Sequence, residues 1–396
     1  MRRDASPGPA TPLNDTLDPP LMAPLPLAGV RILSLAEQYP GPYATMLLAD
    51  LGADVILVER PAGGDPSRRF PGLFAAFNRN KRSVALDLKS PQGHADFLRL
   101  VDSADVVLEG FRPGVMARLK LGAEVLRARK PALICASISS FGQTGPAASI
   151  AGHDLSIQAA AGMIQVAPGQ EAGYALPVLP LADISSAMFA ALGIVTALYA
   201  RSNSGLGTEV DVSMFDTLIS WMTPFLVPPA NGLPTRTLPP EDPGYGLFAT
   251  RDGQQITLSI AGEDPMWRAL CDWLGLAQFA QLGEQARSQA ARQITPLLRQ
   301  AVAQHDHADL CQQLEARHIA FGPVSSLGQV LDDPQLVARR MAVTIAGPNG
   351  QQIFVRQPLI IGGAIGSLQN QAPTLGQHNA DLLPPLAPIT PAKAAD

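Results

Sequence analysis

Apolar residues in the first half of the chain occur in short runs that alternate with stretches of helical periodicity. The runs predict strands at 29–35, 53–59, 84–88, 105–108 and 132–137, and the periodic stretches predict helices near 43–51, 93–101 and 122–128. Val55, Ile56, Leu57 and Val58 follow one another without a polar break, which is typical of a parallel strand covered on both faces. This half is therefore predicted to be an α/β domain with a parallel sheet and helices on both faces.

The pattern changes in the second half. Small apolar residues at about 156–200 predict long helices, followed by a strand at 210–213 and a helix at 214–221. Pro and Gly crowd residues 224–243 and predict a linker, after which two strands and several amphipathic helices indicate a smaller α+β domain. The predicted organisation is a flexible N-terminal arm at 1–26, a large domain at 27–223, a linker at 224–245, a small domain at 246–342, and a segment at 343–396 that returns to the large domain and ends in a tail.

Length and composition exclude several classes of protein. The 396 residues are enough for two globular domains, and 46% hydrophobic with 16% charged residues is a globular composition. The net charge of -5 argues against a nucleic-acid partner. Cys135, Cys271 and Cys311 lie far apart, so neither disulfides nor a zinc site is expected, and no other metal site is predicted. We expect a cytoplasmic protein without a membrane partner, because no signal peptide is evident and no stretch approaches roughly 20 apolar residues.

The β-α-β start invites a dinucleotide-binding interpretation, but the motif that would carry it is absent. The first turn lacks GxGxxG, and Tyr39-Pro40 occupy the place where the backbone must approach a pyrophosphate. Glu59 at the end of the second strand could bind a ribose, although a lone acid there is weak support. P-loop, HExxH and GxSxG motifs are also absent from the sequence.

Three basic groups follow segments of the predicted sheet. They are Arg60, the group Asn80-Lys81-Arg82, and Phe111-Arg112 with Arg118 downstream. Loops at the carboxyl ends of parallel strands line the ligand crevice, and Arg and Lys suit phosphate oxygens. Each group alone is typical of a solvated loop, whereas together they indicate a site for a phosphorylated ligand.

An acid and a histidine begin an otherwise apolar helix at Gly152-His153-Asp154. Asp154 can be explained as a helix cap, which Asp favours, or as a reacting group. The residues alone leave both explanations open.

Several segments resemble the class III CoA-transferase family, which includes the α-methylacyl-CoA racemases. In one order over most of residues 27–216, they are Leu27–Leu33, Leu51–Val55 with Glu59-Arg60-Pro61, Asn80–Ser83, Glu109–Gly114, Phe141–Pro146, Gly152–Asp154 and Gly205–Met214. The resemblance implies a Rossmann-like large domain, a small domain and an interlocked homodimer. It also implies that CoA is a substrate, that no other cofactor is needed, and that the CoA-binding residues are Gln38, Arg60, Asn80, Lys81, Arg82, Leu86, Phe111, Arg112 and Arg118.

The resemblance implies two mechanisms on one scaffold. In the transferases, an aspartate at the position of Asp154 attacks the thioester of an acyl-CoA, and CoA then moves to a small carboxylic acid through anhydride and aspartyl-CoA intermediates. In the racemases, His153 and Asp183 exchange the α-proton, with Glu263 as a supporting residue. Gln143 in the Gly-rich segment is a second supporting candidate. We favour the transferase, because Ile157–Gly162 is closer to transferases, and keep the racemase and a non-catalytic CoA-binding protein as alternatives.

Overall fold

The computed structural model describes residues 24–164, 176–234, 242–348 and 350–383. The chain divides into two compact units, Met1–Trp221 with Met341–Asp396, and Met222–Arg340. The predicted arm at 1–26 lies outside the described residues up to position 23. The predicted domain boundaries at 223 and 342 lie within two residues of the unit boundaries.

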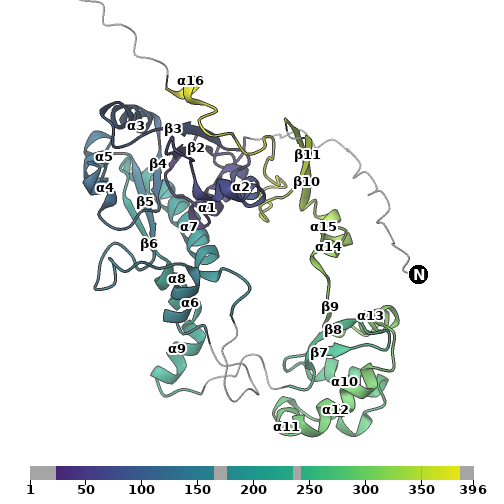
Figure 1. Ribbon diagram of the computed structural model, residues 1–396. Coiled ribbons are helices and arrows are strands. Elements are labelled where there is room, and N and C mark those ends of the chain that lie inside the picture. Colours follow the sequence, from purple (N-terminus) through teal and green to yellow (C-terminus); the bar gives the residue numbers. More distant parts are fainter. Residues whose placement is uncertain (1–23, 165–175, 235–241, 349, 384–396) are drawn as a thin grey trace, which may run out of the picture. The chain divides into compact units, whose positions relative to one another are not determined.

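A six-stranded parallel sheet forms the centre of the first unit (Figure 1). Its strands are β1 (Arg31–Ser34), β2 (Asp54–Glu59), β3 (Arg82–Ala85), β4 (Val106–Glu109), β5 (Ile134–Ser139) and β6 (Glu209–Ser213). The order β3-β2-β1-β4-β5-β6, with every neighbouring pair parallel, is the doubly wound Rossmann arrangement. The predicted α/β fold with a Rossmann-like sheet is confirmed.

Alternate side chains of the central strands pack into two hydrophobic cores, one on each face of the sheet. Ile32 of β1 packs with α1 (Pro40–Asp50) and α7 (Leu181–Ser204), whereas its neighbour Leu33 packs on the opposite face. That opposite face is covered by α3 (Pro91–Ser103) and α5 (Ala123–Arg129). The shorter elements of the first unit are η1 (Pro66–Arg69), α2 (Pro71–Asn78), α4 (Val115–Arg118), α6 (Asp154–Ala160), α8 (Met214–Trp221) and α16 (Asn379–Leu382).

Helix α7 is one of the long helices predicted at about 156–200, but its apolar stretch is longer than expected. By length and composition alone its 24 residues could cross a membrane, so the expectation that no stretch approaches this length was wrong. In the fold the helix packs against α1, α8, β5 and β6, and Ala187, Ala190 and Ile194 are buried in the core. Its small residues allow α1 to pack closely, which explains the Ala-rich composition.

The described residues after position 341 belong to the first unit, as predicted for the segment that begins at 343. Strands β10 (Ala342–Gly347) and β11 (Gly350–Val355) pair with each other as an antiparallel hairpin, separate from the six-stranded sheet. Arg79 connects this segment to the sheet domain, because its guanidinium donates to the Val355 carbonyl and to the buried Asp50 carboxylate.

The second unit is an α+β fold built on its own core. Antiparallel strands β7 (Tyr245–Ala249), β8 (Gln255–Ser259) and β9 (Phe321–Pro323) pack against helices around a buried Trp267. The helices are α10 (Asp264–Trp273), η2 (Ala277–Phe279), α11 (Glu284–Gln289), α12 (Ala291–Val302), α13 (His307–Ala316), α14 (Leu327–Val330) and α15 (Pro334–Ala338). The predicted linker begins with a helix, α9 (Thr223–Ala230), which contains Pro228 and Pro229. The smaller α+β domain is confirmed.

Candidate active site

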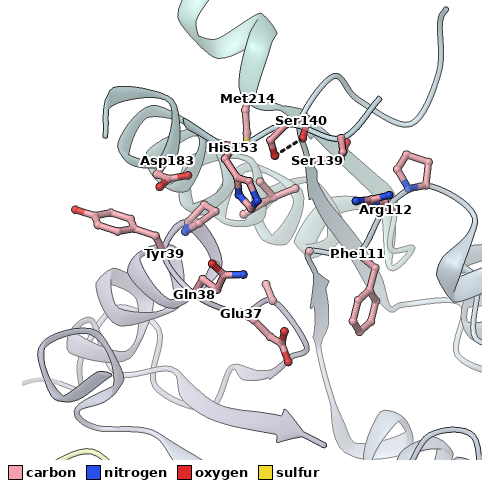
Figure 2. A pocket seen from close by; sticks show the side chains of 18 of the residues that line it. Glu37, Gln38, Tyr39, Phe111, Arg112, Ser139, Ser140, His153, Asp183 and Met214 are labelled. Atoms are coloured by element: carbon pink, nitrogen blue, oxygen red, sulfur yellow. Dashed lines mark hydrogen bonds between the residues drawn. The ribbon is translucent and has the colours of Figure 1, made fainter. Parts of the chain in front are cut away.

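A cavity of about 310 Å³ opens at the carboxyl end of the sheet, where the strand order reverses between β1 and β4. Open α/β sheets bind ligands at this switch point. Figure 2 shows the cavity walls, which come from segments far apart in the sequence. They are 36–41 after β1, 110–113 after β4, 138–140 at the end of β5, 148 and 150–153 before α6, and two single residues, Asp183 and Met214.

The first wall is shaped by a tight turn between β1 and α1. Gly41 packs so closely on this turn that an added Cβ would lie 2.1 Å from the Cβ of Ala36. Gln38 has a positive φ of 68°, which is unusual for a residue other than glycine. The Asp65 carboxylate holds this conformation by accepting the Gln38 backbone N–H, at 3.2 and 3.1 Å from its two oxygens. The strained backbone keeps the Gln38 side chain on the cavity wall.

Asp154 is the first residue of α6, but it does not cap that helix, because His153 occupies the N-cap position. Its carboxylate instead reaches the N-terminus of α7, where Oδ1 accepts the backbone N–H groups of Ala182 at 2.8 Å and Asp183 at 3.3 Å. The positive end of the helix dipole stabilises a negative charge at this position. Asp154 therefore does cap a helix, but the helix is α7 and not α6, which the helix-cap explanation had assumed.

The other oxygen of Asp154 is held by Gln158, one helical turn further along α6. Nε2 of Gln158 donates to Oδ2 of Asp154 at 2.7 Å and to the carbonyl of Leu179 at 3.1 Å. Gln158 is only 1% exposed, so its amide has a fixed orientation. No motif marks Gln158, although its spacing of four residues from Asp154 on a predicted helix was a usable signal.

His153 and Asp183 both line the cavity, and Figure 2 shows them on one side of it with Gln38 and Tyr39 nearby. Burial, and next the charge of Asp154, raise the pKa of Asp183 to about 7. Burial also raises the pKa of Tyr39, with further contributions from Tyr43, Asp183 and Asp154. The cavity lining therefore includes the carboxyl groups of Asp183 and Glu37, the latter with a pKa also raised by burial, and a phenol that stays neutral. Asp154 is half-buried and outside the cavity lining, but it follows His153 in the chain and accepts the backbone N–H of Asp183.

The predicted CoA-binding residues separate into two groups. Gln38, Phe111 and Arg112 line the cavity. Arg60 and Arg118 are exposed and lie outside its lining, and Arg60 donates from Nε to the Gly64 carbonyl at 2.9 Å.

Three further residues of that prediction have structural partners. Lys81 is buried and donates to the Pro42 carbonyl, to Thr45 Oγ1 and to Asn78 Oδ1 at 2.8–2.9 Å. Asn80 bonds to the 367–370 segment and Arg82 pairs with Asp54. Their contact with CoA stays a prediction, as does that of Leu86, which is 6% exposed in the core below α3.

The two predicted supporting residues each have structural partners of their own. Gln143 lines a separate cavity with Glu109 and Asp211, and its backbone N–H donates to the Asp211 carboxylate at 2.9 Å. Glu263 belongs to the second unit, where it is the N-cap residue of α10 and accepts the backbone N–H of Ala261 at 2.7 Å. Among the described residues there is no group of three His, Cys, Asp or Glu side chains that could hold a metal ion.

Known proteins resemble this chain in sequence. The model of CoA-transferase family III matches residues 27–379. The succinate–glutarate CoA-transferase of Agrobacterium fabrum is 33% identical over 92% of this chain and 96% of its own. The succinyl-CoA:mesaconate CoA-transferase of Haloarcula hispanica is 34% identical over 90% and 95%.

Solved structures agree with the sequence comparison. The crystal structure of a CAIB/BAIF family protein from Brucella suis superposes with a TM-score of 0.79, at 30% identity over 90% of this chain and 98% of that one. A Mycobacterium tuberculosis protein gives a TM-score of 0.82, at 32% identity over 91% and 99%. The family resemblance inferred from the motifs is confirmed. The chain belongs to CoA-transferase family III and is an enzyme that transfers CoA between an acyl-CoA and a carboxylic acid.

Proposed function

We propose that the enzyme exchanges CoA between small dicarboxylic acids, with Asp154 as the covalent nucleophile. The observation that carries this proposal is the Asp154 carboxylate, oriented by three hydrogen-bond donors beside a cavity at the switch point of the sheet. The relatives named for succinate, glutarate and mesaconate support dicarboxylic substrates. Arg112 on the cavity wall is a suitable partner for the distal carboxylate of such an acid.

In the first half of the reaction, Asp154 attacks the thioester carbonyl of the donor. A C–O bond forms, the C–S bond breaks, and the products are a mixed anhydride and CoA thiolate. Oδ2 is the favoured attacking oxygen, because it gives up one hydrogen bond, from Gln158, whereas Oδ1 would give up two. The thiolate then attacks the aspartyl carbonyl carbon and expels the donor acid, leaving an Asp154–CoA thioester.

In the second half, the carboxylate of the acceptor attacks the aspartyl thioester and releases the thiolate. The thiolate attacks the acyl carbonyl of the new anhydride, which forms the product acyl-CoA and frees Asp154. Each attack on the aspartyl carbon places negative charge on Oδ1, where the N–H groups of Ala182 and Asp183 already donate. These two amides act as an oxyanion hole that needs no rearrangement. The proposed sequence uses no redox step.

An exchange assay tests the proposal. Succinyl-CoA is incubated with glutarate or mesaconate, and the new acyl-CoA is measured by mass spectrometry. Asp154→Ala and Asp154→Asn should lower exchange by at least about 10³-fold, the order of loss when a covalent nucleophile is removed. Asp105→Asn is the matched control, because Asp105 accepts structural hydrogen bonds from Arg31 and Arg201 at the opposite end of the sheet. Exchange that persists in both Asp154 variants would refute the nucleophile role.

The racemase alternative keeps a specific observation in its favour, because His153 and Asp183 both line the cavity. A racemase would exchange the α-proton of a 2-methylacyl-CoA into deuterium oxide without any acceptor acid. We expect the wild-type enzyme to show acid-dependent CoA exchange and no such proton exchange. The non-catalytic alternative conflicts with the match to CoA-transferases over most of the chain.

We also propose that the enzyme is a homodimer. Helix α7 exposes four apolar residues at spacings of four, three and four, which places them on one face: Met188, Leu192, Val195 and Tyr199, at 49%, 60%, 39% and 73% exposure. A second copy of the chain would cover this face. Light scattering should give twice the mass of one chain at micromolar concentration, and a monomer would contradict the proposal.

A further inference from the structure

The backbone and the side chain of Asp183 lie in different parts of the proposed site. Its backbone N–H donates to Oδ1 of Asp154 at 3.3 Å, while its side chain lines the cavity that Arg112, Gln38 and His153 also line. Asp183 therefore lies next to the proposed nucleophile and has its side chain on the cavity wall. The proposed mechanism assigns a role to the backbone of Asp183 and none to its carboxyl group.

The surroundings of the Asp183 carboxyl group favour its neutral form. It is half-buried on the third residue of α7, with the Asp154 carboxylate as the charged group that acts on it, and no cation contributes to its pKa. Tyr39, the other titratable group whose pKa is affected by Asp183, is itself a neutral phenol. Because the pKa of Asp183 is raised to about 7, the carboxyl is mostly protonated in mildly acidic solution and half protonated near neutrality.

The chemistry of the reaction needs a donor at this place. When Asp154 attacks the acyl thioester, and again when the thiolate attacks the acyl anhydride, the acyl carbonyl oxygen becomes an oxyanion. The amides of Ala182 and Asp183 serve the aspartyl oxygen and are not free for the acyl oxygen. The acceptor also arrives as a carboxylate, so an ionised Asp183 beside Asp154 would add a second repelling charge.

We propose that Asp183 acts as a neutral carboxylic acid, donating its O–H to the acyl carbonyl oxygen and to the carboxylate of the incoming acceptor. This inference rests on the proposed transferase function and assigns Asp183 a role opposite to that of a base. The proton stays on Asp183 throughout, because the group donates a hydrogen bond and transfers no proton. Apolar sites in other enzymes keep an aspartic acid neutral at pH 7 for this purpose.

The proposal predicts a specific pH profile for the wild-type enzyme. The acceptor kcat/KM for succinyl-CoA with glutarate should fall as the pH rises through about 7, where Asp183 loses its proton. Tyr39→Phe should retain this decline, because Tyr39 is neutral on both sides of it.

Two substitutions at the same position separate a donor from a base. Asp183→Asn keeps an N–H donor at every pH, so it should stay within about tenfold of wild-type activity at pH 6 and lose the decline near pH 7. Asp183→Ala lacks the donor and should lose about 10²–10³-fold in acceptor kcat/KM. Both variants keep the backbone N–H that holds Asp154, and neither can ionise at this position, so their ratio isolates the side-chain donor.

Three results would overturn the inference. Asp183→Asn as inactive as Asp183→Ala would do so, with thermal unfolding used to confirm that both variants are folded. So would wild-type activity that rises through pH 7, or α-proton exchange that Asp183→Asn abolishes, since each would show a base. Failure of the transferase proposal itself appears separately, as absence of exchange by the wild-type enzyme with any acid.

Discussion

Gln158 is buried, lies outside the cavity lining and donates a hydrogen bond to the proposed nucleophile, Asp154. In Gln158→Met the volume is nearly kept, but Asp154 Oδ2 and the Leu179 carbonyl each lose their donor. A hydrogen bond to a charged group contributes about 1.5–3 kcal/mol and a neutral one about 1 kcal/mol. Leu179 is 59% exposed, so water can replace the second bond at low cost. We expect a loss of about 2–3 kcal/mol in the free energy of unfolding.

The same change should affect catalysis more than stability alone explains. With Gln158 removed, two amides at one oxygen still hold Asp154, but nothing fixes the plane of its carboxylate. Displacement of a reacting group by about 1 Å costs on the order of 10²-fold in rate. We therefore expect kcat for CoA exchange to fall about 10–100-fold at pH 6, where Asp183 is protonated, while the variant remains folded.

Gln357→Met is the matched control. Gln357 is also 1% exposed, and its amide donates to the carbonyls of Leu359 at 2.8 Å and Ile365 at 3.3 Å, outside the cavity lining. Urea unfolding should show comparable losses of stability for the two variants, whereas only Gln158→Met should lose kcat. Equal loss of kcat in both variants, or wild-type kcat in Gln158→Met, would refute the orienting role.

Two other predictions concern groups outside the reacting centre. Lys81→Met should lower the free energy of unfolding by about 1–3 kcal/mol, because three acceptors lose their donor. The Kd for CoA, measured by calorimetry, should stay within about twofold of the wild-type value. A tenfold weaker Kd would instead support the predicted CoA contact. Burial, and to a smaller extent the charge of Asp211, raise the pKa of Glu109 to about 7 in the folded state, above its value in the unfolded chain. The free energy of unfolding should therefore fall as the pH rises toward 7, because the unfolded chain loses the Glu109 proton at a lower pH than the folded chain. Glu109→Gln should therefore gain stability relative to wild type between pH 5 and 8 in urea unfolding, and a pH-independent difference would contradict this.

The parallel sheet was predictable because its strands are short, buried and nearly continuous in apolar residues. Val55–Val58 lies within β2, and the predicted helix at 93–101 lies within α3. Strand boundaries were less accurate where pairing with a neighbouring strand decides them. The strand predicted at 84–88 is β3, which begins at Arg82 because that residue pairs in register with Ile56 of β2. The helix at Thr223–Ala230 was missed because three of its eight residues are Pro, which disfavours a helix interior.

Sites were predictable only as far as a motif or a local spacing carried them. The motif located His153 and Asp154, but the partners of Asp154 on α7 are 28 and 29 residues away and are backbone groups without a side-chain signature. The basic group at Asn80–Arg82 resembled a phosphate site because its partners are far away in sequence. In the fold these side chains bond to Asp50, Asp54, Thr45 and the 367–370 segment, which no spacing rule reveals.

The most direct test of the account is the capture of the covalent intermediate on Asp154. The enzyme is incubated with succinyl-CoA without acceptor, treated with hydroxylamine or borohydride, digested and sequenced by mass spectrometry. We predict a hydroxamate or a reduced side chain at Asp154 in the wild type and in Asp105→Asn, and none in Asp154→Asn. An enzyme that exchanges CoA rapidly, yet carries no modification at Asp154 or carries it at another residue, would contradict the central claim.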